Sequence, residues 1–326
     1  MHNLSTHPPS QTTDMKKRLI VFLFFWLLTS PLAAQESIKR IIGPELNGIK
    51  QRLIIQGKDD TKPLLLFLHG GPGFGSTGYA KKFVKVLKNE FIMVQWDQRH
   101  TGATKSWNPD NTPLSLELMQ QDTEAVVNYL LTSFAREKIY SVGFSWGSFL
   151  GLHYAKNHPN TLHAYVSVSG LVNGNQSEKQ ILADLMAKAR ANKDQEALEA
   201  LSSIKIPFED AEDIYLQRKW TGEFFPESME NTRLKQSLVT NWAETWLPIF
   251  LEASSIDYGK TAASIDCPVY FFHSPLDRVA HHATARAYYE QLKAPKKVWI
   301  SFPTAPHEIV SADPKEFANA LRAVLN

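Results

Sequence analysis

The chain has 326 residues, 43% of them hydrophobic and 21% charged, which is the composition of an ordinary globular protein. A formal net charge of +2 gives no reason to expect binding to nucleic acid or to an acidic membrane surface. The single cysteine, Cys267, excludes an intramolecular disulfide, and the length suits one large domain with an insertion or two domains.

Residues 1–34 have the pattern of a secretory signal peptide. A basic start at residues 15–18 precedes the uninterrupted apolar residues 19–28, and Ala33 and Ala34 supply small side chains for cleavage. This apolar run is too short to span a bilayer comfortably. We therefore expect an exported protein, periplasmic or secreted if bacterial, with no membrane contact after signal removal. An uncleaved anchor is the alternative, and Met15 is a second candidate for the true start.

After residue 50, apolar runs bounded by Gly and Pro alternate with segments of helical spacing. Such runs are typical of strands that are buried on both faces of a parallel sheet. Strands are expected at residues 52–56, 63–68, 91–96, 139–142, 164–169, 269–273 and 297–300, and helices at 79–89, 116–134, 149–156, 283–292 and 317–325. The alternation predicts an α/β fold with a mostly parallel, doubly wound sheet.

Residues 171–264 interrupt this alternation. Residues 177–200 are helical and charged, and Trp220, Trp242 and Trp246 follow without any strand-like pattern. We therefore expect a helical cap over the sheet. It would separate two halves of a core, residues 35–170 and 265–326, which follow the N-terminal segment 1–34.

Residues 143–148, Gly-Phe-Ser-Trp-Gly-Ser, stand between a predicted strand and a predicted helix. This is the context of a G-x-S-x-G nucleophile elbow, in which a sharp turn holds the serine hydroxyl out at the top of a sheet. Glycines are needed there because a side chain would collide with the neighbouring strand and helix. The pattern alone is common in turns, so Ser145 is a predicted nucleophile only together with a base.

The base and its carboxylate follow in the order that the elbow requires. A serine hydroxyl is a poor nucleophile until a base takes its proton, and a carboxylate must orient that base. Asp277 follows the predicted strand 269–273, and His307 follows the predicted strand 297–300. Both come just after strand carboxyl ends, the edge at which open α/β sheets bind ligands. The order predicts Ser145, Asp277 and His307 as the catalytic triad of a hydrolase that works through an acyl-enzyme.

The glycine-rich residues 69–73, His-Gly-Gly-Pro-Gly, follow an early predicted strand. A loop there can aim a backbone N–H at a developing oxyanion, together with the N–H of the residue after the nucleophile. We expect these donors at Gly71 and Trp146, with Gly70 as the alternative to Gly71. The loop lacks the spacing of a phosphate or dinucleotide loop, and the histidines and carboxylates form no convincing metal cluster. No cofactor is therefore expected.

Three motifs together, at residues 69–73, 97–99 (Asp-Gln-Arg) and 143–148, resemble those of the proline iminopeptidase family of α/β-hydrolases. The resemblance covers about residues 50–170 and 265–326. It implies an α/β-hydrolase fold with a helical cap, the same triad, and a supporting role for residues 97–99. It also implies an aminopeptidase that cleaves N-terminal residues from peptides.

The cap is where the sequence departs most from that family, whose aminopeptidases hold the free amino group with cap carboxylates near a Trp-Glu pattern. Residues 242–246 read Trp-Ala-Glu-Thr-Trp, which makes Glu244 a candidate substrate ligand, and Glu223 and Glu227 are further cap carboxylates. A carboxylesterase that acts on small esters is the alternative within the same chemistry. A catalytically silent hydrolase fold that serves as a binding protein is the alternative of another class.

Overall fold

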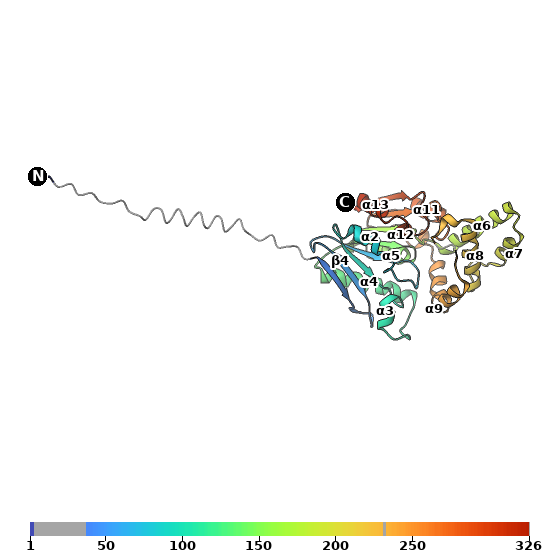
Figure 1. Cartoon of the computed structure of the whole chain (residues 1–326), viewed down its shortest axis with the longest axis horizontal. Helices are drawn as coiled ribbons and strands as arrows, with labels where there is room; N and C mark the ends of the chain where they lie inside the picture. Colours follow the sequence, from blue (N-terminus) through green and yellow to red (C-terminus); the bar gives the residue numbers. More distant parts are fainter. Residues whose placement is uncertain (3–36, 231–232, 326) are drawn as a thin grey trace. The chain divides into compact units, whose positions relative to one another are not determined.

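The computed structural model describes residues 1–2, 37–230 and 233–325, which are coloured in Figure 1. Among these residues an eight-stranded sheet has the order β1-β4-β6-β5-β7-β8-β9-β10. The strands from β6 to β10 in this order pair in parallel, whereas β4 pairs antiparallel with both β1 and β6. The predicted α/β fold with a mostly parallel sheet is therefore confirmed.

The strand bounds agree closely with the predicted runs. The strands of the sheet are β1 (Ile38–Ile42), β4 (Leu53–Gly57), β5 (Leu64–Leu68), β6 (Ile92–Trp96), β7 (Ile139–Phe144), β8 (Leu162–Val168), β9 (Val269–His273) and β10 (Lys297–Ser301). A separate two-stranded ladder joins β2 (Glu45–Leu46) to β3 (Ile49–Lys50). The sequence did not predict β1 or this ladder, because both are short and exposed along much of their length.

Helices cover both faces of the sheet. They are α2 (Lys81–Leu87), α4 (Leu116–Ser133), α5 (Trp146–Asn157), α11 (His282–Gln291), α12 (Ile309–Ala312) and α13 (Pro314–Leu325). A short helix, α3 (Gly102–Trp107), follows the loop after β6, and a 3₁₀ turn lies at Pro159–Thr161. Successive side chains of a strand point to opposite faces, and β5 is buried along its whole length. Leu66 packs in the apolar cluster with α4 and α5, whereas Phe67 packs with α2 and α13.

The chain between β8 and β9 is helical. It forms α6 (Gly174–Asn192), α7 (Gln195–Ser203), α8 (Ala211–Phe224), α9 (Gln236–Ser255) and α10 (Tyr258–Thr261), with a 3₁₀ turn at Pro226–Ser228. Figure 1 shows α6 to α9 gathered together, apart from α2. These helices share an apolar cluster of their own, which includes Leu185, Leu201 and Trp220. The helical character of residues 171–264 is as predicted, and their division from the core as a cap stays a prediction.

Residues 3–36 lie outside the described part of the chain, so the signal peptide expected at residues 1–34 and the start at Met15 stay predictions. Among the described helices, none is long and apolar enough to cross a membrane.

Candidate active site

Ser145 lies on a sharp turn between β7 and α5. Its φ of 53° and ψ of −115° are values that residues with a side chain rarely adopt. The turn is tight because its glycines have no side chains: a β-carbon on Gly143 would collide with the Gly147 carbonyl, and one on Gly147 with the Leu68 carbonyl. The Ser145 N–H donates to the Val168 carbonyl of β8 at 2.9 Å. The predicted elbow therefore has the strained geometry that its motif requires.

The structure brings Ser145, His307 and Asp277 into one hydrogen-bonded chain. His307 Nε2 lies 3.0 Å from Ser145 Oγ, and His307 Nδ1 lies 2.8 Å from Asp277 Oδ2. The other carboxylate oxygen of Asp277 accepts the N–H groups of Val279 and Ala280 at 2.8 and 2.9 Å. Because a carboxylate only accepts, the ring proton of His307 is on Nδ1, and its Nε2 lone pair faces the serine.

The loop that carries His307 is held in place through its backbone. The His307 N–H donates to the Ser228 carbonyl at 2.8 Å, and the His307 carbonyl accepts the Ser169 hydroxyl at 2.7 Å. Ser169 directly follows β8, while Ser228 ends the 3₁₀ turn after α8. The sheet and the helical segment thus both position this histidine.

The two charged partners shift each other's proton affinity. Burial disfavours ionisation of Asp277, but His307, His273 and the Val279 N–H together outweigh it and keep the pKa of the carboxyl below its ordinary value. Burial also disfavours the charged form of His307, and here Asp277 outweighs it, so the pKa of His307 is raised above its ordinary value. A charged imidazole is therefore stabilised beside Asp277, which is what a base that must take up a proton needs.

His273 ends β9 in the core, as expected, and lies close to the same carboxylate. Its Nδ1 is 3.2 Å from the Ser274 carbonyl, and its Nε2 is 4.0 Å from Asp277 Oδ2. The ring stacks on Trp299 with a centroid distance of 5.6 Å. Burial lowers the pKa of His273 to about 4, so this second histidine is neutral at neutral pH.

Of the two glycines considered as oxyanion donors, Gly70 has a backbone N–H that already donates a hydrogen bond. Its N–H donates to the Tyr79 hydroxyl at 3.0 Å. Gly71 lines a cavity together with Ser145 and Trp146. Trp146 is the first residue of α5, and an N–H at that position has no acceptor within its own helix. The geometry thus favours the pair Gly71 and Trp146 over Gly70.

Gln98 joins the glycine loop to the elbow helix. Its backbone N–H donates to His69 Nε2 at 3.2 Å, and its side-chain amide donates to the His69 carbonyl at 3.1 Å. The amide oxygen of Gln98 accepts the indole N–H of Trp146 at 3.0 Å. Burial lowers the pKa of His69 to about 4, which leaves its Nε2 free to accept. Gln98 therefore links the glycine loop to the elbow helix, which agrees with the supporting role that the resemblance implies for residues 97–99.

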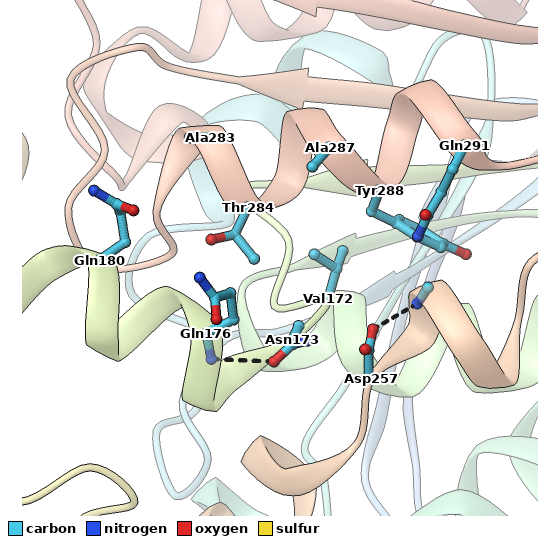
Figure 2. A pocket seen from close by; sticks show the side chains of 11 residues that line it. Val172, Asn173, Gln176, Gln180, Asp257, Ala283, Thr284, Ala287, Tyr288 and Gln291 are labelled. Carbon is cyan, nitrogen blue, oxygen red and sulfur yellow. Dashed lines mark hydrogen bonds between the residues drawn. The ribbon is translucent and has the colours of Figure 1, made fainter.

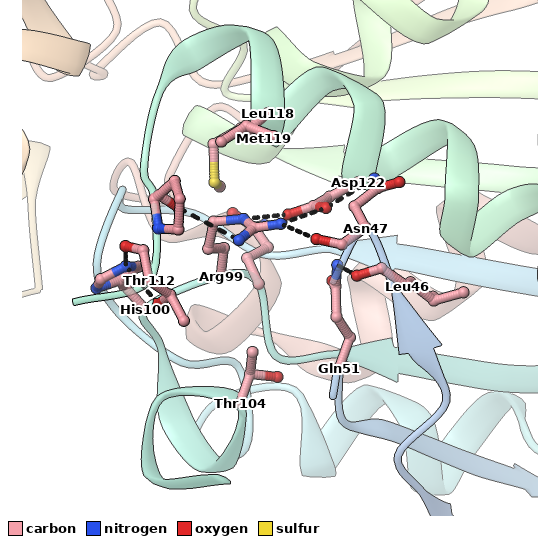
Figure 3. A network of polar contacts seen from close by, with 12 residues as sticks. Leu46, Asn47, Gln51, Arg99, His100, Thr104, Thr112, Leu118, Met119 and Asp122 are labelled. Carbon is pink, nitrogen blue, oxygen red and sulfur yellow. Dashed lines mark hydrogen bonds and ion pairs between the residues drawn. The ribbon is translucent and has the colours of Figure 1, made fainter. Parts of the chain in front are cut away.

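Arg99 anchors this loop to α4 (Figure 3). Its Nε and Nη2 donate to the two carboxylate oxygens of Asp122 at 2.7 and 2.9 Å, and both side chains are almost completely buried. The guanidinium also donates to the carbonyls of Pro113 and Asn47. Asn47 in turn donates to Asp122 at 2.9 Å, so the buried charges are fully satisfied by partners.

The cavity beside Ser145 has a volume of about 390 Å³. Its wall is largely apolar, with Leu171 following β8 and with Ile214, Trp242 and Phe250 on the helices between β8 and β9. Phe74 and Leu238 also line it while remaining 62% and 57% exposed, so they stand at its mouth. The cavity thus lies between the sheet edge and the helical segment, as ligand sites in α/β folds do.

Three charged side chains line the same cavity: Glu178, Arg218 and Glu308. Glu178 is buried and is engaged by both terminal nitrogens of Arg218, one of them at 2.9 Å. Glu308 follows His307 directly, and its Oε2 accepts the N–H of Glu230 at 2.9 Å. Among the described residues Glu308 takes part in no ion pair. Within the described part of the chain, the cavity wall therefore has one carboxylate that is paired with a cation and one that is not.

The structure does not bring Glu244 to the cavity. Its side chain is exposed on α9 and is absent from the cavity wall. Successive residues of a helix are about 100° apart, so Glu244 points roughly 200° away from Trp242, which does line the cavity. Glu223 and Glu227 are exposed as well. Glu178 and Glu308 stand there instead, and the adjacency of Glu308 to His307 was the signal in the sequence that could have found it.

A second cavity, of about 330 Å³, lies between α6 and α11 (Figure 2). Amide side chains reach into it, among them Gln176 and Gln180 from α6 and Gln291 from α11. Its wall contains none of the predicted catalytic residues. Across residues 1–2, 37–230 and 233–325, no group of three His, Cys, Asp or Glu side chains is placed to hold a metal ion.

Comparisons with known proteins agree with this architecture. The family described as alpha/beta hydrolase fold matches residues 63–314. Over 305 residues the chain is 28% identical to "Probable aminopeptidase YbaC" of Bacillus subtilis (strain 168), covering 85% of this chain and 93% of that protein.

Two solved structures are similar over almost their whole length. A proline iminopeptidase from Mycobacterium smegmatis has a TM-score of 0.62 at 17% identity, covering 88% of this chain and 97% of that one. The esterase RhEst1 from Rhodococcus sp. ECU1013 has a TM-score of 0.58 at 15% identity, covering 89% and 98%. At such identities these structural matches establish the fold, and they do not separate a peptidase from an esterase.

Proposed function

The chain belongs to the alpha/beta hydrolase fold family, and on that premise we propose that it is a serine hydrolase that works through an acyl-enzyme. The observation that carries the proposal is the hydrogen-bonded chain from Ser145 through His307 to Asp277, with distances of 3.0 and 2.8 Å. These are the lengths of ordinary hydrogen bonds, and the chain ends at a cavity large enough for a small substrate.

In the first half of the reaction His307 Nε2 takes the hydroxyl proton as Ser145 Oγ attacks the substrate carbonyl carbon. The Gly71 and Trp146 N–H groups hold the negative oxygen of the tetrahedral intermediate. The C–N or C–O bond then breaks, and the imidazolium gives its proton to the leaving amine or alcohol. The acyl group remains bound to Ser145 as an ester.

In the second half a water molecule replaces the leaving group. His307 takes a proton from this water, whose oxygen attacks the acyl carbon in the same oxyanion hole. Collapse of the intermediate breaks the bond to Ser145 Oγ, and the imidazolium returns its proton to the serine. Asp277 keeps the ring in one tautomer and stabilises its charged form throughout, so the cycle needs no cofactor.

The favoured substrate is a peptide with a free N-terminus. Glu308 supports this choice because it is a carboxylate with no ion-pair partner among the described residues, and it lines the same cavity as Ser145. A protonated α-amine is its natural partner. The similarity to a protein named as an aminopeptidase points the same way. We assign the amine to Glu308 and not to Glu178, because Arg218 already occupies both oxygens of Glu178.

A carboxylesterase acting on small esters is the second candidate. The observation in its favour is the largely apolar wall of the cavity, which can hold an acyl chain without any charged contact. A catalytically silent hydrolase fold that binds a partner is the candidate of another class.

A hydrolysis screen separates these candidates. Aminoacyl amides, including prolyl amides, are tested beside short acyl esters, with Ser145→Ala as the control and a fluorophosphonate as the label for the serine. We expect labelling at Ser145 and faster cleavage of amides with a free amine than of their N-acetylated counterparts. Cleavage that is indifferent to acetylation and prefers esters supports the esterase. Activity that survives Ser145→Ala refutes the assigned nucleophile, and a folded wild type without label or activity supports the silent fold.

The exported location is a separate proposal that depends on residues 15–34. Expression in a bacterial host, followed by mass spectrometry of the secreted or periplasmic protein, measures its N-terminus. We expect cleavage shortly after Ala34. A chain that still begins at Met1 or Met15 contradicts the signal peptide.

A further inference from the structure

The loop that carries Gly71 is anchored by different parts of the chain before and after that residue. Before it, the Gly70 N–H donates to the Tyr79 hydroxyl at 3.0 Å. After it, the Pro72 carbonyl accepts the indole N–H of Trp242 at 2.8 Å. Trp242 belongs to α9, so a helix from the segment between β8 and β9 holds the second half of the loop.

A second tryptophan of α9 packs on the same loop. Trp246 comes four residues after Trp242, and residues at this spacing share one face of a helix. Trp246 is buried, and a β-carbon on Gly73 would overlap its indole ring. Gly73 has a φ of 89°, in the region that favours glycine. Glycine at this position therefore lets the Trp246 ring lie directly against the loop backbone.

The helix that carries both tryptophans is fixed to the rest of the molecule. Trp246, Ile249 and Ala253 belong to the same apolar cluster as β5 and α5. Val239, in the first half of α9, belongs to the cluster of the helical segment. Trp242 lies between Val239 and Trp246 on α9 and packs against both clusters. Its indole is therefore fixed in place and supports the Pro72 carbonyl firmly.

We propose that Trp242 is a positioning residue for the oxyanion hole. Its indole N–H holds the Pro72 carbonyl, and this contact sets the direction of the Gly71 N–H one residue earlier. The inference rests on the proposed function, because it assumes that Gly71 donates to the oxyanion. It makes the geometry of the catalytic loop depend on a helix that contributes no member of the triad.

The size of the expected effect follows from what an oxyanion donor contributes. Removal of one donor lowers kcat by about 10²–10³-fold in acyl-transfer enzymes. A donor that is displaced and not removed loses part of this contribution. We therefore expect Trp242→Phe, which keeps an aromatic ring and loses the N–H, to lower kcat by about tenfold or more while KM stays within about twofold.

The test measures kcat and KM of the wild type and of Trp242→Phe on the best substrate of the screen. It also measures the inhibition constant of a trifluoromethyl ketone analogue, which forms a tetrahedral adduct with a catalytic serine. The matched control is Trp220→Phe, because Trp220 is buried in the same helical segment and its indole N–H has no partner among the described residues. Gly73→Ala disturbs the same loop at the next residue, because its β-carbon would overlap the Trp246 ring.

We expect Trp242→Phe and Gly73→Ala to lower kcat and to raise the inhibition constant of the ketone by similar factors. Trp220→Phe should leave both quantities unchanged. Three results overturn the inference alone: an unchanged kcat in Trp242→Phe, an equal loss in Trp220→Phe, or a rise in KM without loss of kcat. A wild type that neither hydrolyses any substrate nor reacts with fluorophosphonate overturns the proposed function, and the inference fails with it.

Discussion

Two regions of the molecule meet at the cavity, and they are built differently. The sheet edge supplies Ser145, Asp277 and His307, each from a turn that directly follows a strand and each fixed by backbone hydrogen bonds. The helices between β8 and β9 supply apolar side chains and the ion pair of Arg218 with Glu178. The sheet edge thus fixes the side chains of the proposed triad, while the helical segment shapes the cavity beside them.

The largest effect is expected from a substitution that changes the sheet edge and leaves the helical segment intact. Asp277→Asn keeps the size of the side chain but removes the charge that orients His307. We expect kcat to fall by about 10⁴-fold, because the ring adopts the wrong tautomer, while KM changes little. Steady-state kinetics measure the effect, with thermal unfolding as the check on folding. A loss below tenfold would contradict the assigned role of Asp277.

The buried pair of Arg99 and Asp122 is expected to affect the free energy of unfolding more than catalysis. Arg99→Gln leaves the buried Asp122 carboxylate without its paired cation (Figure 3). Breaking a buried pair in this way destabilises a protein by about 3–5 kcal/mol. Urea unfolding measures the loss. Arg322→Gln is the matched control, because Arg322 and Glu90 form a pair that is about one-third exposed, for which about 0–1 kcal/mol is expected. Equal losses in the two variants would contradict the buried network.

The pH dependence tests the sheet edge without any substitution. His307 works as a base only when it is unprotonated, and its pKa is raised by Asp277 above the ordinary value of about 6.5. We therefore expect kcat/KM to rise about tenfold per pH unit on the acid side and to level off above a midpoint higher than 6.5. A midpoint below 6.5 would mean that burial outweighs Asp277 in the free enzyme.

The smallest effect on kinetics is expected from a substitution of Glu308 in the wall of the cavity. Glu308→Gln should raise KM for a substrate with a free amine by about tenfold and leave the KM of a small ester unchanged. It should also move the acid limb of the pH profile to lower pH, because the Glu308 charge helps to raise the pKa of His307. Glu244→Gln is the control, since Glu244 is exposed outside the cavity. Equal effects in the two variants would contradict the amine site at Glu308.

The same contrast explains what the sequence could predict. Ser145, Asp277 and His307 each follow an apolar run, and the carboxyl ends of parallel strands meet at one edge whatever the helices do. The placement of Glu244 failed because the inward face of α9 depends on what the helix packs against. Once Trp242 and Trp246 face the loop, a residue midway between them must face outward. The sequence did not predict that Glu178 lines the cavity, because its ion-pair partner Arg218 lies forty residues later in the chain.

The separate apolar cluster of α6 to α9 has a consequence for enzyme engineering. Most of the segment packs on this interior, but Trp246, Ile249 and Ala253 of α9 pack in the apolar cluster of the sheet. An exchange of the segment between homologous hydrolases should therefore transfer the substrate preference only if these contacts of α9 with the sheet are kept. The two indoles on α9 set the condition for such an exchange. A transplanted segment that brings no donor for the Pro72 carbonyl would acquire the new specificity and lose turnover at the same time.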